Sequence, residues 1–96
     1  MNFPSKSDIT VHPTTGTVSL RGKDATLTRT QTVIFNKLMD QESSREELIE
    51  LVWPTTKVSA KALDVHMCNL RKNLAPLGVT VALDGGFYRL EMYDVR

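Results

Sequence analysis

The sequence predicts an α+β fold, in which short antiparallel strands come first, three helices follow and a hairpin ends the chain. Three observations support this prediction. Apolar residues alternate with polar ones over about residues 8–27, recur at helical spacing over about residues 29–75, and alternate again over about residues 79–93. One domain over residues 1–96 is expected, because a chain of 96 residues with 41% hydrophobic residues can build one compact core without disulfides or metals.

The first third of the chain predicts strands near residues 8–12, 17–21 and 25–27. Turn signals separate these strands at Thr15-Gly16 and at Arg21-Gly22-Lys23-Asp24. The alternating apolar positions that would face the core are Ile9, Val11, Val18, Leu20 and Leu27.

Two capping patterns predict the first two helices, over about residues 29–40 and 45–53. Thr28 stands three residues before Gln31, and Ser44 stands three residues before Glu47. At this spacing the hydroxyl accepts from one backbone N–H and the longer side chain accepts from the other, which makes a capping box. Pro54 ends the second helix, because a proline has no backbone N–H and its ring obstructs the preceding turn.

A third helix is expected over about residues 60–75, between Ser59 and Pro76. Its apolar residues recur at i, i+4, i+7 and i+11, so they form one stripe that faces the core, namely Leu63, Met67, Leu70 and Leu74. Helical geometry places five residues on the opposite face, namely Lys61, Val65, Cys68, Asn69 and Lys72.

The outward face of this third helix suits the major groove of duplex DNA. Its lysines can neutralise phosphates or donate to guanine, and Asn69 carries the donor and acceptor pair that reads adenine. Val65 and Cys68 can lie against a thymine methyl group, while His66 and Arg71 lie on the flanks near backbone phosphates. The solvated face of an ordinary surface helix explains the same residues. However, a long helix behind a shorter capped helix, followed at once by a hairpin, is the order of a winged helix-turn-helix.

Composition excludes several other classes of protein. The net charge of +1 gives no strong overall positive field, so a DNA-binding surface must come from local clustering of cations. One cysteine, Cys68, allows no internal disulfide, and no Cys or His spacing matches a zinc site, so a cytoplasmic setting without cofactors is expected. No apolar run is long enough for a membrane span, so no membrane contact is expected. An enzyme is not expected, since His12 and His66 have no sequence partners that complete a catalytic set.

Three segments of the chain carry recognisable motifs. They are Ser44-Arg45-Glu46-Glu47-Leu48-Ile49-Glu50-Leu51-Val52-Trp53, then Leu63-Asp64-Val65-His66-Met67-Cys68-Asn69-Leu70-Arg71-Lys72-Asn73-Leu74, and finally Tyr88-Arg89-Leu90. In this order and spacing they resemble the OmpR/PhoB-type winged-helix effector domain of bacterial or phage regulators, which often belong to two-component systems. The resemblance covers nearly the whole chain. It implies sequence-specific binding of double-stranded DNA in transcription regulation, with the third helix in the major groove and the hairpin as the wing.

The resemblance also implies roles for single residues. In this family the positions of Arg45 and Trp53 touch the DNA backbone, and Tyr88 matches a wing tyrosine that contacts phosphate. The loop of residues 54–58 touches RNA polymerase in some members. Two of these residues also have simpler interpretations, since a tryptophan before a proline suits the core and Arg45 suits a solvated first turn. The recognition-helix positions that reach phosphates or bases are Lys61, Ala62, His66, Cys68, Asn69 and Arg71.

The chain also departs from the family pattern. Asp84 stands in the hairpin turn, where relatives often carry a basic residue, and Cys68 and Asn69 stand where many relatives carry arginines. Fewer charged contacts predict modest affinity and a weak dependence on salt. Binding as a dimer to repeated half-sites would offset the loss.

Two questions stay open at this point. A receiver domain usually precedes such an effector domain, but none precedes Met1. The chain is therefore a free-standing regulator, an excised fragment, or the cytoplasmic part of a one-component activator. The acidic wing and the low net charge also favour an alternative function, in which a winged-helix module binds proteins and does not bind DNA. A positive stripe from Arg45 through Lys61 and Lys72 would favour DNA, and an apolar patch there would favour a protein partner.

Overall fold

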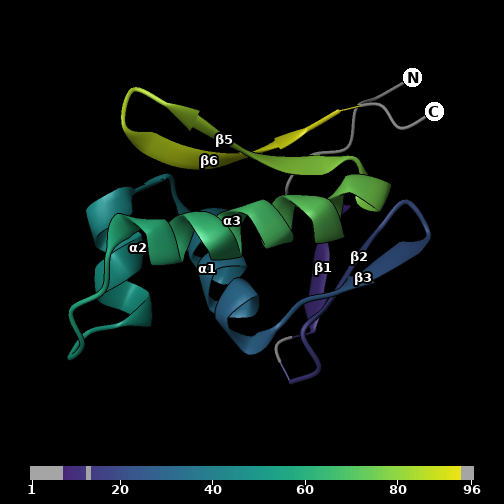
Figure 1. Cartoon of the computed structure of the whole chain (residues 1–96). Helices are drawn as coiled ribbons and strands as arrows, with labels where there is room; N and C mark the ends of the chain where they lie inside the picture. The colour runs from purple at the N-terminus through teal and green to yellow at the C-terminus, as the bar shows by residue number, and fades with distance from the viewer. Residues whose placement is uncertain (1–7, 13, 94–96) are drawn as a thin grey trace.

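The computed structural model describes residues 8–12 and 14–93. In chain order the elements are β1 (Thr10–His12), β2 (Thr17–Leu20), β3 (Lys23–Thr26), α1 (Arg29–Asp40), β4 (Ser43–Ser44), α2 (Arg45–Val52), α3 (Ala60–Leu74), the short 3-10 helix η2 (Ala75–Leu77), β5 (Val79–Asp84) and β6 (Phe87–Met92). Figure 1 shows α3 crossing the middle of the molecule, with the β5–β6 hairpin along one side, α2 near its start and the N-terminal strands near its end. This is the predicted winged-helix arrangement.

The N-terminal sheet has the strand order β1-β2-β3, with antiparallel neighbours. Its third strand begins at Lys23, two residues before the expected start, and ends at Thr26. The reason is a tight turn in which Arg21 and Gly22 both adopt positive φ angles, of 57° and 75°, so that Leu20 already pairs with Lys23.

Both expected capping boxes are present. The hydroxyl of Thr28 accepts from the backbone N–H of Gln31 at 3.2 Å, and the Gln31 side chain accepts from the backbone N–H of Thr28 at 3.1 Å. At α2 the Ser44 hydroxyl accepts from the N–H of Glu47 at 3.1 Å, and the Glu47 carboxylate accepts from the N–H of Ser44 at 3.0 Å. Each box satisfies backbone donors that a helix leaves free at its start. The starts of α1 and α2 are therefore determined by local sequence.

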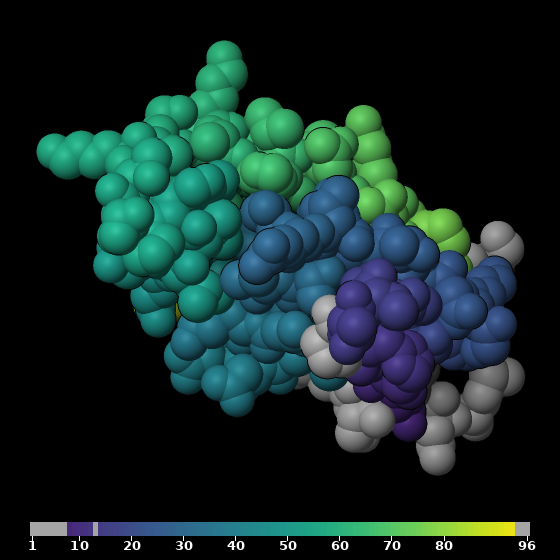
Figure 2. Space-filling view, turned by 90° about the horizontal axis from the view of Figure 1, so that it is seen from below, coloured from purple at the N-terminus to yellow at the C-terminus, as the bar shows by residue number. Residues whose placement is uncertain are grey.

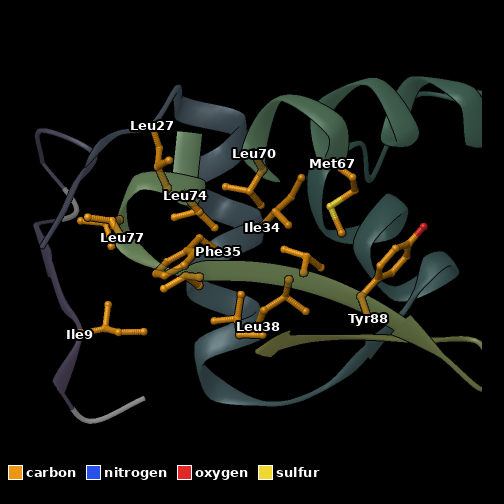
Figure 3. Close-up of a cluster of buried hydrophobic side chains, with 14 of the residues drawn as sticks. Ile9, Leu27, Ile34, Phe35, Leu38, Met67, Leu70, Leu74, Leu77 and Tyr88 are labelled. Carbon is orange, nitrogen blue, oxygen red and sulfur yellow. The ribbon is translucent and has the colours of Figure 1, made fainter. Parts of the chain in front are cut away.

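The core lies between α3, α1 and the β5–β6 hairpin, as the side chains in Figure 3 illustrate. The predicted stripe of α3 is buried, and α1 contributes side chains that are fully enclosed. Burying one such leucine stabilises the fold by about 1.5–3 kcal/mol, so this packing holds α3 with one face inward. The residues concerned are Leu63, Met67, Leu70 and Leu74 from α3 and Ile34, Phe35 and Leu38 from α1.

The two-residue strand β4 was not expected from the sequence. Ser43 pairs with Tyr88, and Ser44 pairs with Phe87, so that β4 adds to the hairpin in the strand order β4-β6-β5. Two serines show no apolar alternation, so no periodic signal marks them as a strand. The pairing attaches the start of α2 directly to β6.

Candidate nucleic-acid interface

The outer face of α3 consists of Lys61, Val65, Cys68, Asn69 and Lys72, and all five residues are exposed. They are exposed because the leucine stripe on the other side of the same helix is buried, which sets the rotation of α3 about its axis. Within the described part of the chain, the side chains of Lys61, Asn69 and Lys72 have no hydrogen-bond or ion-pair partner. In Figure 2 the segment from the end of α2 through α3 forms one border of the molecule, and its side chains project outward.

Beside this face, His66 lies against Trp53. Their ring centroids are 5.7 Å apart and the ring planes are inclined at 45°. Both residues are half-buried, and Trp53 also packs against the core at the end of α2. Trp53 is therefore partly a core residue, as the simpler interpretation expected, and its ring also lies beside His66 of α3. Ala62 is half-buried in the first turns of the same helix.

Arg45 begins α2 and points toward the start of α3. Its Nη2 lies 3.6 Å from a carboxylate oxygen of Asp64 and donates to the hydroxyl of Tyr88 at 3.4 Å. The hydrogen bond with Tyr88 raises the pKa of Arg45 and so favours the charged guanidinium. With 40% of its side chain exposed, Arg45 keeps surface available for an outside ligand.

Tyr88 lies inside the fold, with 2% of its surface exposed. A buried ring has no surface to offer a phosphate, so the contact that the resemblance implied does not fit this arrangement. Its hydroxyl instead holds Arg45. The strand pattern contains the signal for this, because Tyr88 and Leu90 lie two residues apart in β6 and therefore share the core-facing side.

Arg71 and Asn73 each donate a hydrogen bond within the protein. The Nε of Arg71 donates to the backbone carbonyl of Val81 in β5 at 2.8 Å. The amide of Asn73 donates to the side chain of Gln31 at the start of α1 at 2.9 Å. Asn73 had no role in the sequence analysis, because its partner is 42 residues away and no local pattern connects the two.

The wing differs from the outer face of α3 because its arginine is paired with carboxylates of the protein. Arg89 in β6 forms ion pairs with Asp84 at 3.1 Å, with Glu91 at 3.0 Å and with Glu42 at 3.9 Å. Three carboxylates against one guanidinium leave a formal charge of −2 in this group. Exposed apolar side chains stand at the same tip, since Leu83 and Phe87 are 50% and 47% exposed.

These features agree with a comparison with known families. The model for the C-terminal domain of transcriptional regulatory proteins matches residues 22–83, which is more than half of the chain. The chain belongs to this family. The resemblance to OmpR/PhoB-type effector domains is confirmed, and the domain is a response-regulator type DNA-binding domain for transcription regulation, not an enzyme.

Solved structures show the same fold for the family domain. The DNA-binding domain of the response regulator AdeR, in complex with an intercistronic region, superposes with a TM-score of 0.72 at 25% identity, covering 90% of this chain and 95% of that one. The C-terminal domain of the nisin resistance regulator NsrR gives a TM-score of 0.71 at 26% identity, covering 91% and 95%. The DNA-binding domain of Escherichia coli CadC gives 0.69 at 23% identity, covering 90% and 88%.

No curated protein sequence matches this chain significantly. In the described residues, no helix has both the length and the apolar character that crossing a membrane requires.

Proposed function

We propose that α3 is the recognition helix and that its outer face enters the major groove of duplex DNA. A groove about 12 Å wide admits an α-helix. Lys61 and Lys72 bind phosphates or guanine, Asn69 reads adenine, and Val65 and Cys68 lie against thymine methyl groups. The observation that carries the proposal is the exposed outer face of α3, on which both lysines and Asn69 lack partners within the described chain.

Residues beside the outer face of α3 complete the proposed interface. Arg45 binds a backbone phosphate, and its position supports this because it is partly exposed in the first turn of α2, where the helix dipole favours an anion. Trp53 and His66 present the exposed parts of their neighbouring, mutually tilted rings to the DNA backbone. Ala62 allows close approach because its side chain is small.

Tyr88 acts indirectly in this proposal. Its hydroxyl holds the guanidinium of Arg45 beside α3, which keeps the cation at the border of the interface. The long side chain of Arg45 then loses less conformational freedom when it binds a phosphate.

The alternative function, a module that binds proteins and not DNA, draws support from the acidic and apolar wing. The outer face of α3 argues against it. Val65, 54% exposed, is the one large apolar residue exposed on α3, while lysines stand before and after it. An isolated apolar side chain among cations suits a thymine methyl group better than an apolar protein surface.

The loop of residues 54–58 is proposed to contact RNA polymerase, and the domain is proposed to bind repeated half-sites as a dimer in the cytoplasm. In the loop, Pro54, Thr55, Thr56 and Lys57 are exposed and border a hollow that includes Trp53. Alanine substitution of Thr55 and Lys57 is expected to leave DNA affinity unchanged and to reduce activated transcription in a reconstituted assay. Footprints that appear on two half-sites at the same protein concentration would support the dimer.

Selection from random duplexes, followed by fluorescence anisotropy on the selected duplex, tests the main proposal. Lys72→Glu is expected to weaken binding by about 1–3 kcal/mol, which corresponds to about fivefold to 150-fold. Lys23→Glu is the matched control, because Lys23 is also exposed but lies at the start of β3 in the N-terminal sheet. This control is expected to bind within about twofold of the wild type.

Two outcomes contradict the proposal. Equal binding by the wild type and Lys72→Glu at low salt would show that α3 does not face the DNA. If the selection enriches no particular sequence, the proposed reading of a base by Asn69 is wrong. Circular dichroism of each variant confirms that the fold is intact.

A further inference from the structure

Arg71 lies in the last turn of α3, at the border of the outer face, and is half-buried. Its Nε donates to the carbonyl oxygen of Val81 at 2.8 Å, well within the usual range for such a bond. This bond joins the recognition helix to β5, the first strand of the wing. It is the one side-chain hydrogen bond between α3 and the hairpin among the described residues.

The carbonyl of Val81 is available because of the register of the hairpin. Asp84 and Phe87 pair around the two-residue loop, and β5 is the edge strand of the order β4-β6-β5. Counting back from that closing pair, every second residue of β5 turns its backbone groups away from β6, and Val81 is one of these. Arg71 therefore satisfies an acceptor on the free edge of the sheet.

A second hydrogen bond holds the same end of α3. The amide of Asn73 donates at 2.9 Å to the side chain of Gln31, which is 3% exposed and also accepts from the N–H of Thr28. Arg71 and Asn73 thus join the end of α3 to the wing on one side and to α1 on the other. At the start of α3, by contrast, the contact between Arg45 and Asp64 is a 3.6 Å ion pair of partly exposed groups. Such pairs contribute little.

We propose that Arg71 is a positioning residue that acts on DNA binding through the angle between α3 and the wing, and not by neutralising a phosphate. The inference rests on the proposed function and refines the role that the family resemblance implied for this position. The side chain works through a hydrogen bond to a neutral carbonyl. Its positive charge is not the property that matters.

Three substitutions of Arg71 distinguish a positioning role from a phosphate-binding role. In arginine, Nε is bonded to Cδ, and in glutamine the donor Nε2 is bonded to Cδ as well, so glutamine places a neutral donor at the same distance along the side chain. Lysine keeps the charge but places its donor one bond further out. Methionine has similar length and no donor. A positioning role therefore predicts rescue by glutamine, and a phosphate role predicts rescue by lysine.

The experiment compares Arg71→Gln, Arg71→Lys and Arg71→Met, with Lys72→Gln as the matched control that removes one charge from the adjacent position. Affinity for the selected duplex is measured by anisotropy between 50 and 200 mM salt, values chosen from the range in which phosphate contacts are salt-sensitive. We expect Arg71→Gln to bind within about twofold of the wild type with an unchanged salt slope. Arg71→Met is expected to bind about threefold to tenfold more weakly, as the loss of one hydrogen bond implies. Only Lys72→Gln is expected to lower the salt slope, by about 0.9.

A second measurement reports on the orientation of α3 without DNA. Hydrogen exchange at the amides of β5 and the carbonyl chemical shift of Val81 are expected to stay near wild type in Arg71→Gln and to change in Arg71→Met. If Arg71→Met does not fold, the comparison of glutamine with lysine still decides between the two roles.

Three results separate this inference from the proposed function. If Arg71→Lys binds like the wild type while Arg71→Gln loses affinity and salt slope together, Arg71 contacts phosphate and the inference is wrong, although the proposed function stands. If Arg71→Met binds like the wild type, the bond to Val81 has no effect and the inference is also wrong. If neither the wild type nor any variant binds duplex DNA, the proposed function fails and the inference fails with it.

Discussion

The outer face of α3 and the wing both carry basic residues, but only α3 leaves them free. Lys61 and Lys72 have no partner in the described structure, whereas Arg89 in the wing is surrounded by the carboxylates of Asp84, Glu91 and Glu42. The difference teaches that the number of cations on an element does not locate a DNA-binding surface. What matters is whether carboxylates of the same protein already neutralise them.

This difference has an electrostatic basis. Each exposed ion pair of Arg89 is worth little by itself, about 0–1 kcal/mol. Together, however, three carboxylates and one guanidinium give the group a formal charge of −2, and the Debye length of about 8 Å at physiological salt lets that charge act on a nearby phosphate. We therefore expect the wing to repel the DNA backbone and the proposed binding to depend on α3 and Arg45.

Changing the charge of the wing tests this comparison most strongly. Asp84→Lys removes a carboxylate and adds a cation at the exposed tip, so it is expected to tighten duplex binding by about threefold to tenfold and to steepen the salt slope by about 0.9. Asp40→Lys makes the same change at the exposed end of α1 and serves as control. Anisotropy titrations at several salt concentrations give both quantities. Equal effects of the two substitutions would mean that the wing is not close to the DNA.

Removing the carboxylate of Asp64, the ion-pair partner of Arg45 among the described residues, tests the border of α3. Asp64→Asn is expected to tighten binding by about twofold to fivefold, because the guanidinium loses its internal ion pair and a negative charge leaves the recognition helix. Binding at 50 and 200 mM salt, a range over which such effects are screened, is the measurement. Weaker binding by this variant would show that Asp64 accepts from a base and does not merely compete for Arg45.

Asn69→Ala tests whether the outer face of α3 reads DNA bases, as distinct from attracting the phosphate backbone. It is expected to lower affinity by less than about threefold, while the preference for adenine at one position of the selected sequence is lost. Parallel duplex selections with the wild type and the variant show the change. Identical consensus sequences from both would remove the proposed role of Asn69.

The smallest expected effect concerns the start of α2, which carries Arg45. The backbone N–H of Ser44, followed by its hydroxyl, lowers the pKa of Glu47 by hydrogen bonding to the carboxylate. Because the pKa is lower in the folded state, this stabilisation is complete above the ordinary glutamate pKa of about 4.3 and is lost as pH falls through the lower folded pKa. Glu47→Gln should therefore be less stable than the wild type near pH 7, and the difference should shrink below about pH 4. Urea unfolding at several pH values measures it, and a difference that grows on acidification would contradict this assignment.

The sequence predicted the elements whose cause is local. Both capping boxes, the buried stripe of α3 and its exposed opposite face follow from residues within a few positions of each other, and all are present. The strand β4 was missed because two serines pair only through a partner far along the chain. The turn at Arg21 and Gly22 was placed too broadly, because positive φ in a non-glycine residue has no clear sequence signal.

The candidate interface also has one part that the local sequence predicted and another part that depends on residues far apart in the chain. The outer face of α3 was predicted correctly as an exposed surface, while its contacts with DNA stay predictions. Tyr88 was assigned to the DNA side by resemblance, and Arg71 by both its place on the helix flank and resemblance. In the structure the hydroxyl of Tyr88 and the Nε of Arg71 have partners within the protein. No periodicity reports where the end of a long side chain lies, so only the tertiary structure decides these two assignments.

By itself, the sequence determined the order of all the strands and α-helices except β4, and the rotation of α3 about its axis, because helical and strand periods depend on neighbouring residues. Its motifs indicated the family. Only the tertiary structure decided which polar groups remain available to DNA. Arg45 meets Tyr88 across 43 positions and Asn73 meets Gln31 across 42, and the hairpin brings Asp84 and Glu91 to Arg89. Long polar side chains have many rotamers of similar energy, and it is the packed surroundings that select one of them.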